Sequence, residues 1–141
     1  MKAESNVRPN KFEIENIVNN KCEIVLNTNI VEIQDEEGTK YTYDTYRLKT
    51  SYRDNLHEKL ENEEHYRKWL EFAVELEYNE LASDIRAKRD DLLAETDWTQ
   101  VTDSALSEEK KEQYRIYRQA LRDITKQEHF PYEVVFPEMP Q

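Results

Sequence analysis

The sequence predicts an α+β fold: a three-stranded antiparallel β-meander, then a long helix that is either continuous or broken once, and a C-terminal helical hairpin with an extended, proline-rich tail. Three observations predict it. Apolar residues recur with a period of two up to Tyr52 and with helical spacing afterwards. No glycine or proline interrupts residues 53–95. Three of the four prolines lie between Pro131 and Pro140.

The period-two segment is residues 11–52, which we expect to form the meander. Residues 1–10 have no apolar periodicity and are expected to be a flexible lead-in. Turns are expected at Asn19-Asn20, whose side chains tolerate positive φ, and at Gly38. The alternating apolar and polar positions that define the strands include Phe12, Ile14, Ile24, Leu26, Ile30 and Leu48.

Tyrosines crowd the third predicted strand. Tyr41 and Tyr43 have one parity and Tyr46 has the other, so a bulge or bend is expected near Asp44-Thr45. Exposed tyrosine suits contacts with proteins or sugars. Tyr41, Tyr43 and Tyr46 are therefore a candidate contact surface, although cross-strand and core packing is the simpler interpretation.

Residues 53–84 are predicted to be an acidic amphipathic helix, with a break near Glu77-Tyr78-Asn79 left open. Between residues 53 and 98 there are 14 acidic and 7 basic side chains, which predicts a solvated, negatively charged face. The apolar stripe of the long helix comprises Leu56, Leu60, Trp69, Leu70, Ala73, Val74 and Leu76.

Residues 85–141 are predicted to form the helical hairpin and its extended tail. Ser107, followed by two glutamates, is a good N-cap for the second helix. We expect Trp98 to be buried where the chain turns. We also expect Arg89-Asp90 and Arg122-Asp123 to form a reciprocal clasp between the helices. The buried edge of the second helix is predicted to be Tyr114, Tyr117, Leu121 and Ile124.

Composition and charge exclude several classes of function. The net charge of −11 argues against a nucleic-acid or anionic membrane partner. A single cysteine, Cys22, forms no internal disulfide and has no basic residue placed to lower its pKa. His57, Glu61 and His65 share a helix face, but the span from the first to the last is too long for one metal ion. No signal peptide, membrane helix or glycine-rich phosphate loop is recognised, so a non-enzyme without metal or cofactor is expected.

Three motifs follow one another in the C-terminal part of the chain. Residues 89–98 read Arg-Asp-Asp-Leu-Leu-Ala-Glu-Thr-Asp-Trp, residues 117–124 read Tyr-Arg-Gln-Ala-Leu-Arg-Asp-Ile, and residues 134–137 read Val-Val-Phe-Pro. In this order they resemble the family of bacteriophage tail assembly chaperone proteins, over about residues 85–140. In that family the tail often has tryptophan where Phe136 stands. The N-terminal module resembles those of tail proteins from Gram-positive phages.

The resemblance implies a protein of a phage or prophage that binds a tail fibre or receptor-binding protein and assists its folding or attachment. It places the protein in the bacterial host cytoplasm during assembly, or in the virion tail. The residues that it implies for partner binding or for the motif are Arg89, Asp90, Leu92, Leu93, Asp97, Trp98, Tyr117, Arg118, Leu121, Arg122, Asp123, Phe136 and Pro137.

Two alternatives stay open at this point. The protein is a structural companion that remains in the tail or baseplate of a phage or phage-tail-like particle, since the motif often ends longer tail proteins of this family. As a lesser alternative, it is a carbohydrate-binding accessory that uses the tyrosine-rich sheet. Whether it forms a homo-oligomer is also open.

Overall fold

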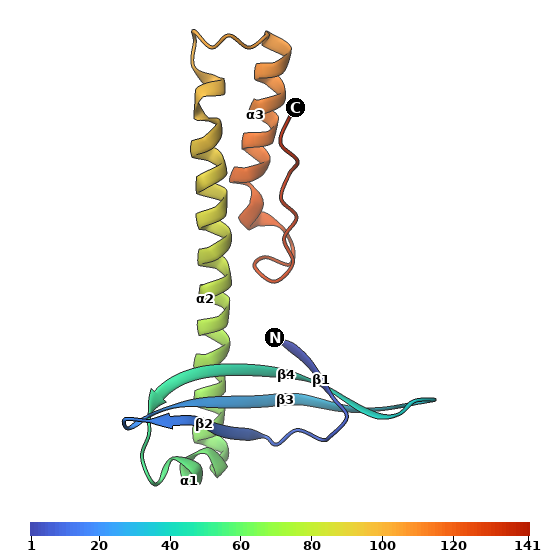
Figure 1. Cartoon of the computed structure of the whole chain (residues 1–141), viewed down its shortest axis with the longest axis vertical. Helices are drawn as coiled ribbons and strands as arrows, with labels where there is room; N and C mark the ends of the chain where they lie inside the picture. Colours follow the sequence, from blue (N-terminus) through green and yellow to red (C-terminus); the bar gives the residue numbers. More distant parts are fainter. The chain divides into compact units, whose positions relative to one another are not determined.

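The period-two segments form one antiparallel sheet in the computed structural model, which describes residues 1–141 throughout (Figure 1). The sheet has four strands in the order β1-β4-β3-β2. Their bounds are β1 Lys2–Ser5, β2 Phe12–Val18, β3 Lys21–Asp35 and β4 Gly38–Ser51. The predicted meander is confirmed as β2, β3 and β4, while the predicted count of three strands is wrong.

The additional strand, β1, lies in the segment expected to be a flexible lead-in. It pairs antiparallel with β4 from Lys2 opposite Asp44 to Ser5 opposite Tyr41. Just before it, the Met1 amide carbonyl accepts from the Thr45 N–H at 2.8 Å, and the Met1 amino group donates to the Thr45 carbonyl at 3.1 Å. Periodicity did not reveal β1 because it is a short edge strand held by backbone bonds, with no apolar alternation of its own.

Two bulges bend the sheet, and neither is in β4. In β3 the register shifts between Thr28 and Val31, opposite Tyr43, and in β2 it shifts between Glu15 and Val18. Each bulge holds an asparagine with positive φ, Asn29 at 52° and Asn16 at 54°. The bulge expected near Asp44-Thr45 therefore lies on the neighbouring strand, because Asn29 takes the left-handed conformation there more readily than β-branched residues do.

The even-numbered face of the sheet carries the main core of the N-terminal part. Helices α1, Leu56–Glu61, and α2, Glu63–Thr96, contribute to it. Fully burying a leucine or isoleucine stabilises the fold by about 1.5–3 kcal/mol. The buried core residues are Cys22, Ile24, Leu26, Leu48, Leu56, Leu60, Tyr66 and Ala73, with Trp69, Leu70 and Leu76 packed against them. The predicted apolar stripe is thus largely confirmed.

A helix break does occur, but at Asn62 and not at Glu77-Tyr78-Asn79. Asn62 has extended backbone angles at the end of α1. Its side-chain oxygen accepts from the N–H groups of Glu64 at 3.1 Å and His65 at 3.2 Å, so it caps α2. The helix then continues without interruption to Thr96.

The chain divides into two compact units, Met1–Glu77 and Tyr78–Gln141, referred to here as unit 1 and unit 2. The boundary falls inside α2, so the first part of this helix packs in unit 1 and the rest in unit 2. No helix of the chain combines the length and the apolar character that crossing a membrane requires.

Unit 2 is a helical hairpin with a tail. After α2 come two short 3₁₀ helices, η1 at Asp97–Gln100 and η2 at Ile124–Lys126, with α3 at Glu108–Arg122 between them. Ser107 caps α3 by accepting from the Lys110 N–H at 3.2 Å, as predicted. Within this unit, α3 lies beside α2 and the C-terminal segment runs back along α3 (Figure 1). The buried edge is confirmed for Tyr117, Leu121 and Ile124, while Tyr114 is half-buried.

We predict a pH-dependent contribution from Asp44, which is buried beside the β3 bulge. Its carboxylate accepts from Asn29 Nδ2 at 2.8 Å and lies 2.8 Å from Lys2 Nζ. Burial raises the pKa of Asp44, but hydrogen bonds from Asn29 and Lys2 outweigh it, so the pKa is lowered overall. A carboxylate whose pKa is lower in the folded state than in the unfolded state stabilises the fold at pH values above its unfolded-state pKa. This contribution to stability disappears as the pH falls through the folded-state pKa.

Asp44→Asn is therefore expected to lower the free energy of unfolding by about 1–3 kcal/mol at pH 7, with the difference from the unmodified chain shrinking below about pH 4. Urea unfolding at several pH values measures this. Asp103→Asn is the control, because the exposed Asp103 side chain makes no ion pair or hydrogen bond. A difference that stays constant with pH would contradict the assignment.

Candidate functional site

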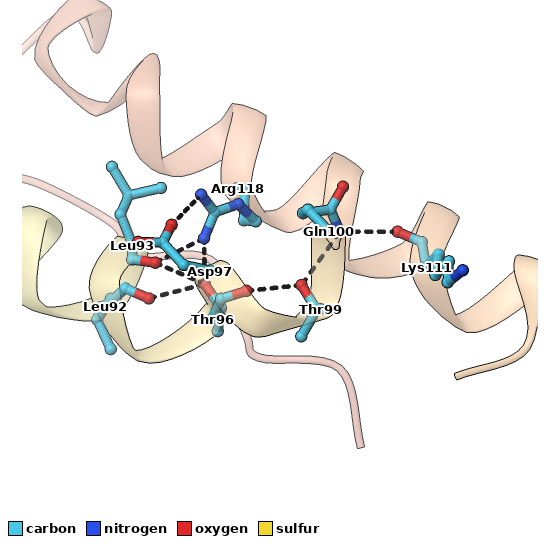
Figure 2. A network of polar contacts seen from close by, with 8 residues as sticks. All are labelled: Leu92, Leu93, Thr96, Asp97, Thr99, Gln100, Lys111 and Arg118. Atoms are coloured by element: carbon cyan, nitrogen blue, oxygen red, sulfur yellow. Dashed lines mark hydrogen bonds and ion pairs between the residues drawn. The ribbon is translucent and has the colours of Figure 1, made fainter. Parts of the chain in front are cut away.

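The polar centre of unit 2 is the buried guanidinium group of Arg118, which α3 directs at the last turn of α2 (Figure 2). Arg118 is only 7% exposed. Its Nη1 donates to the Leu93 carbonyl at 2.6 Å and to Thr96 Oγ1 at 2.8 Å, and its Nη2 donates to Asp97 Oδ1 at 2.6 Å. One side chain thus joins α3 to both α2 and η1.

The same region satisfies the carbonyl groups that a helix leaves unpaired at its C-terminal end. Thr96 Oγ1 donates to the Leu92 carbonyl at 2.8 Å, and Thr99 Oγ1 donates to the Thr96 carbonyl at 2.7 Å. The positive charge of Arg118 also lies where the helix dipole favours a cation. Side chains thus supply donors to the carbonyl groups of Leu92, Leu93 and Thr96 at the end of α2.

Gln100 extends this network toward the start of α3. Its Nε2 donates to Thr99 Oγ1 at 3.1 Å and to the Lys111 carbonyl at 3.3 Å (Figure 2). The predicted site residues did not include Thr96, Thr99 or Gln100, although Thr96 lies in the first motif. A threonine pair three residues apart at a predicted helix end was the available signal, since both hydroxyls can reach backbone carbonyls.

The expected reciprocal clasp between the two Arg-Asp pairs is wrong. Arg89 Nε donates to its own neighbour Asp90 at 2.7 Å. Asp123 accepts from Lys126 Nζ at 2.7 Å and from Gln119 Nε2 at 3.1 Å, and these contacts, Lys126 first, lower its pKa. Arg122 is exposed and makes no ion pair. Arg118 makes the interhelical contact instead, because it alone among these arginines points into the interface.

The expected burial of Trp98 is also wrong: its side chain is 55% exposed. The corner is filled by Thr96 and Thr99, which are 2% and 0% exposed. The indole ring lies on the surface against Tyr114, with ring centroids 6.2 Å apart and the planes tilted by 56°. Because η1 turns the chain directly after α2, Thr99 and not Trp98 faces inward.

The tail is tied to the hairpin at several points. Gln127 exchanges two hydrogen bonds with the backbone of Val135, at 2.8 and 2.9 Å, as a neighbouring strand would. Lys88 Nζ lies 4.2 Å above the ring of Phe136. The Tyr114 hydroxyl donates to the Pro140 carbonyl at 3.2 Å, and Lys110 Nζ donates to the Gln141 carbonyl. Phe136 and Pro137 are half-buried, so this part of the tail packs on its own unit.

The predicted partner-binding residues therefore fall into three groups by their burial. Tyr117, Arg118 and Leu121 are buried and build the hairpin. Arg89, Leu92, Leu93, Asp123, Phe136 and Pro137 are half-buried, and Asp90, Asp97, Trp98 and Arg122 are exposed. Several further apolar side chains of unit 2 are exposed: Tyr78, Val101, Ile116, Tyr132, Val135 and Met139.

In unit 1, the tyrosines of β4 do not form one surface. Tyr46 packs against the core, on the same face as Leu48. Tyr41 and Tyr43 have the opposite parity, and β4 has no bulge that would bring them to the same face. A sugar-binding surface made of all three is therefore not assembled.

The surroundings of Cys22 and His57, the candidate reactive residues of unit 1, give both side chains a structural role. Cys22 is buried in the core, and burial raises the pKa of its thiol. His57 Nδ1 lies 3.5 Å from Glu61 Oε1, and its ring packs edge-on against Phe12. No three His, Cys, Asp or Glu side chains lie close enough together to hold a metal ion.

We predict that Arg118→Ala lowers the free energy of unfolding by about 2–4 kcal/mol, because it leaves the Leu93 carbonyl and the Thr96 hydroxyl without a charged donor. Arg122→Ala is the matched control on the same helix, and it is expected to change stability by less than about 0.5 kcal/mol. Chemical unfolding of both variants measures the difference. Equal effects would contradict a special role for Arg118.

For Trp98→Ala we predict a loss of only about 0.5–1.5 kcal/mol, the contribution of one aromatic pair. A buried aromatic side chain would cost about 3–5 kcal/mol. The melting temperature, with Tyr114→Ala as the reciprocal variant, distinguishes the two cases. A loss in the larger range would mean that the indole ring is interior.

Comparison with known proteins identifies the C-terminal part. Residues 82–141 match the family model described as phage tail assembly chaperone protein. No curated protein and no solved structure matches the chain. The matched segment contains the second half of α2, the Arg118 network, α3 and the tail, and so coincides closely with unit 2. The C-terminal part of this chain, residues 82–141, is thus similar in sequence to the phage tail assembly chaperone protein family.

Proposed function

We propose that the protein is a non-enzymatic assembly chaperone of a phage tail, and that unit 2 binds a tail fibre or receptor-binding protein and assists its folding or attachment. The observation that carries the proposal is the coincidence of the family match, residues 82–141, with a structurally separate unit, Tyr78–Gln141. The family relationship therefore belongs to a unit with its own core.

The architecture of unit 2 suits a binding role. Its hairpin is held by the buried Arg118, and its tail is already packed through Gln127, Phe136 and Tyr114. A surface that is ordered before binding loses little conformational entropy when a partner docks. The motif residues in the interior thus hold the framework, while the binding energy comes from side chains on the surface.

Exposed apolar side chains supply the contact chemistry. Trp98 of η1, Ile116 of α3 and Val135 of the tail are 55%, 58% and 77% exposed. Tryptophan and other large apolar side chains dominate the energy of protein interfaces once a partner covers them. Their positions on three different elements of one unit favour a protein partner with an extended surface.

Charge gives the expected character of that partner. Residues 53–98 carry 14 acidic and 7 basic side chains, and unit 2 includes the later part of this segment. Such an excess attracts a basic surface and raises the association rate more than the final affinity. The association is expected in the host cytoplasm, where tails are assembled.

The test is co-expression with a tail-fibre protein of the same phage, followed by capture from the lysate. A variant with Trp98, Ile116 and Val135 all changed to serine is expected to capture the fibre at least about tenfold less well, since loss of one important interface side chain costs about 2 kcal/mol. The matched control changes Val7, Ile17 and Val31, equally exposed residues of unit 1, to serine. Equal capture by both triple variants would contradict binding through unit 2.

Mass spectrometry of purified particles decides between transient and permanent association. An assembly chaperone is absent from finished tails. Presence at fixed stoichiometry would instead identify a structural companion subunit of the tail or baseplate, which the same binding surface would serve equally well.

A further inference from the structure

One edge of the sheet in unit 1 is open. Strand β4 has β3 along its whole length on one side, from Lys21 opposite Ser51 to Asp35 opposite Gly38. On the other side, β1 covers only Tyr41–Asp44, and Met1 adds its bonds to Thr45. The stretch from residue 46 to residue 51 therefore has no neighbouring strand on that side.

The hydrogen bonds of Thr45 show to which side the N–H and C=O groups of this stretch point. Because Thr45 exchanges both of its hydrogen bonds with Met1, its N–H and C=O point to the β1 side. Residues of an antiparallel strand alternate in the side to which these groups point. The N–H and C=O groups of Arg47, Lys49 and Ser51 thus point outward from the open edge, and all three residues are exposed.

An apolar groove accompanies this edge. It has a volume of about 460 Å³, and its walls come from β4 and from the first part of α2. Phe72 of α2 is 57% exposed although it lies in the groove, and Trp69 beside it is half-buried. The residues that line it are Leu48, Lys49, Thr50, Lys68, Trp69 and Phe72.

We propose that the open edge of β4 is a second binding surface, on which an extended acidic segment of a partner protein adds as a further strand. Backbone groups of Arg47, Lys49 and Ser51 would supply the strand-to-strand hydrogen bonds. Side chains opposite Leu48 share its face and enter the groove over Trp69 and Phe72, so they are apolar. Side chains opposite Lys49 lie on the other face, so acidic residues suit them best.

The positive charges along the open edge favour an acidic partner segment over a second copy of the chain. In an antiparallel self-pairing centred on Leu48, Arg47 of each copy faces Lys49 of the other. Centring on Arg47 or on Lys49 places two identical cations opposite each other. Like charges directly opposite are destabilising. Arg47 already lies 3.0 Å from Glu15 Oε2, whereas Lys49 makes no ion pair, so Lys49 is the cation left for a partner.

This surface lies in unit 1 and does not depend on the binding proposed for unit 2. It is tested with synthetic peptides and without any fibre protein. Since the chain has two tryptophans, a Trp98→Phe background leaves Trp69, beside the groove, as the only indole reporter. The probe is a short end-capped peptide that alternates valine and glutamate. A peptide of the same composition in non-alternating order and an alternating valine–lysine peptide are compared with it.

The alternating valine–glutamate peptide is expected to change Trp69 emission saturably and to bind more tightly than the other two. Lys49→Glu is expected to weaken its binding about five- to tenfold, because an attraction across the strands becomes a repulsion. Lys59→Glu, an exposed lysine of α1, is the matched control and is expected to leave binding unchanged.

Two results would overturn the proposal. One is absence of saturable binding, or equal binding to the Lys49→Glu and Lys59→Glu variants. The other is a dimer of the unmodified chain in sedimentation that Lys49→Pro abolishes, since proline removes an outward N–H that the sheet does not use. That result would assign the edge to a second copy.

Discussion

The C-terminal end of α2 imposes the constraint on which unit 2 depends. A helix that ends inside a protein leaves carbonyl groups that must find donors, because water does not reach them. Here Thr96, Thr99 and Arg118 provide the donors. Since Arg118 comes from the other helix, satisfying the end of α2 also fixes where α3 lies. The same few side chains thus donate hydrogen bonds to the backbone at the end of α2 and hold the two helices together.

The sequence predicted those parts of the fold that rest on local patterns. Period-two alternation located β2, β3 and β4, and Ser107 with two following glutamates located the start of α3. Asn62 is also followed by two glutamates and caps α2 in the same way, yet the absence of glycine and proline from residues 53–95 hid the break. Strand β1 was hidden for a different reason: an edge strand is held by its neighbour's backbone, which leaves little trace in its own side chains.

The sequence predicted which segment of the chain contains the candidate site, but not which of its side chains point inward. The motifs contain Arg118 and Thr96, but nothing in their spacing says which of several arginines points inward. That depends on how η1 reverses the chain, and one residue of difference in the turn exchanges Trp98 for Thr99 in the interior. Large aromatic residues are usually buried, so the size of Trp98 was misleading where a small hydroxyl residue was needed to reach a carbonyl.

The connectivity of the hairpins has a kinetic consequence. Strands β2, β3 and β4 are joined by short turns, and the bonds of Arg118 close loops of only 21 to 25 residues. Short loops close at little entropic cost, and folds rich in local contacts reach the native state quickly. The hairpins of β2, β3 and β4 and the hairpin of unit 2 can thus form early. The pairing of β1 with β4, and the contacts of Tyr66 with Lys11 and Asn27, join distant segments and have to wait for them.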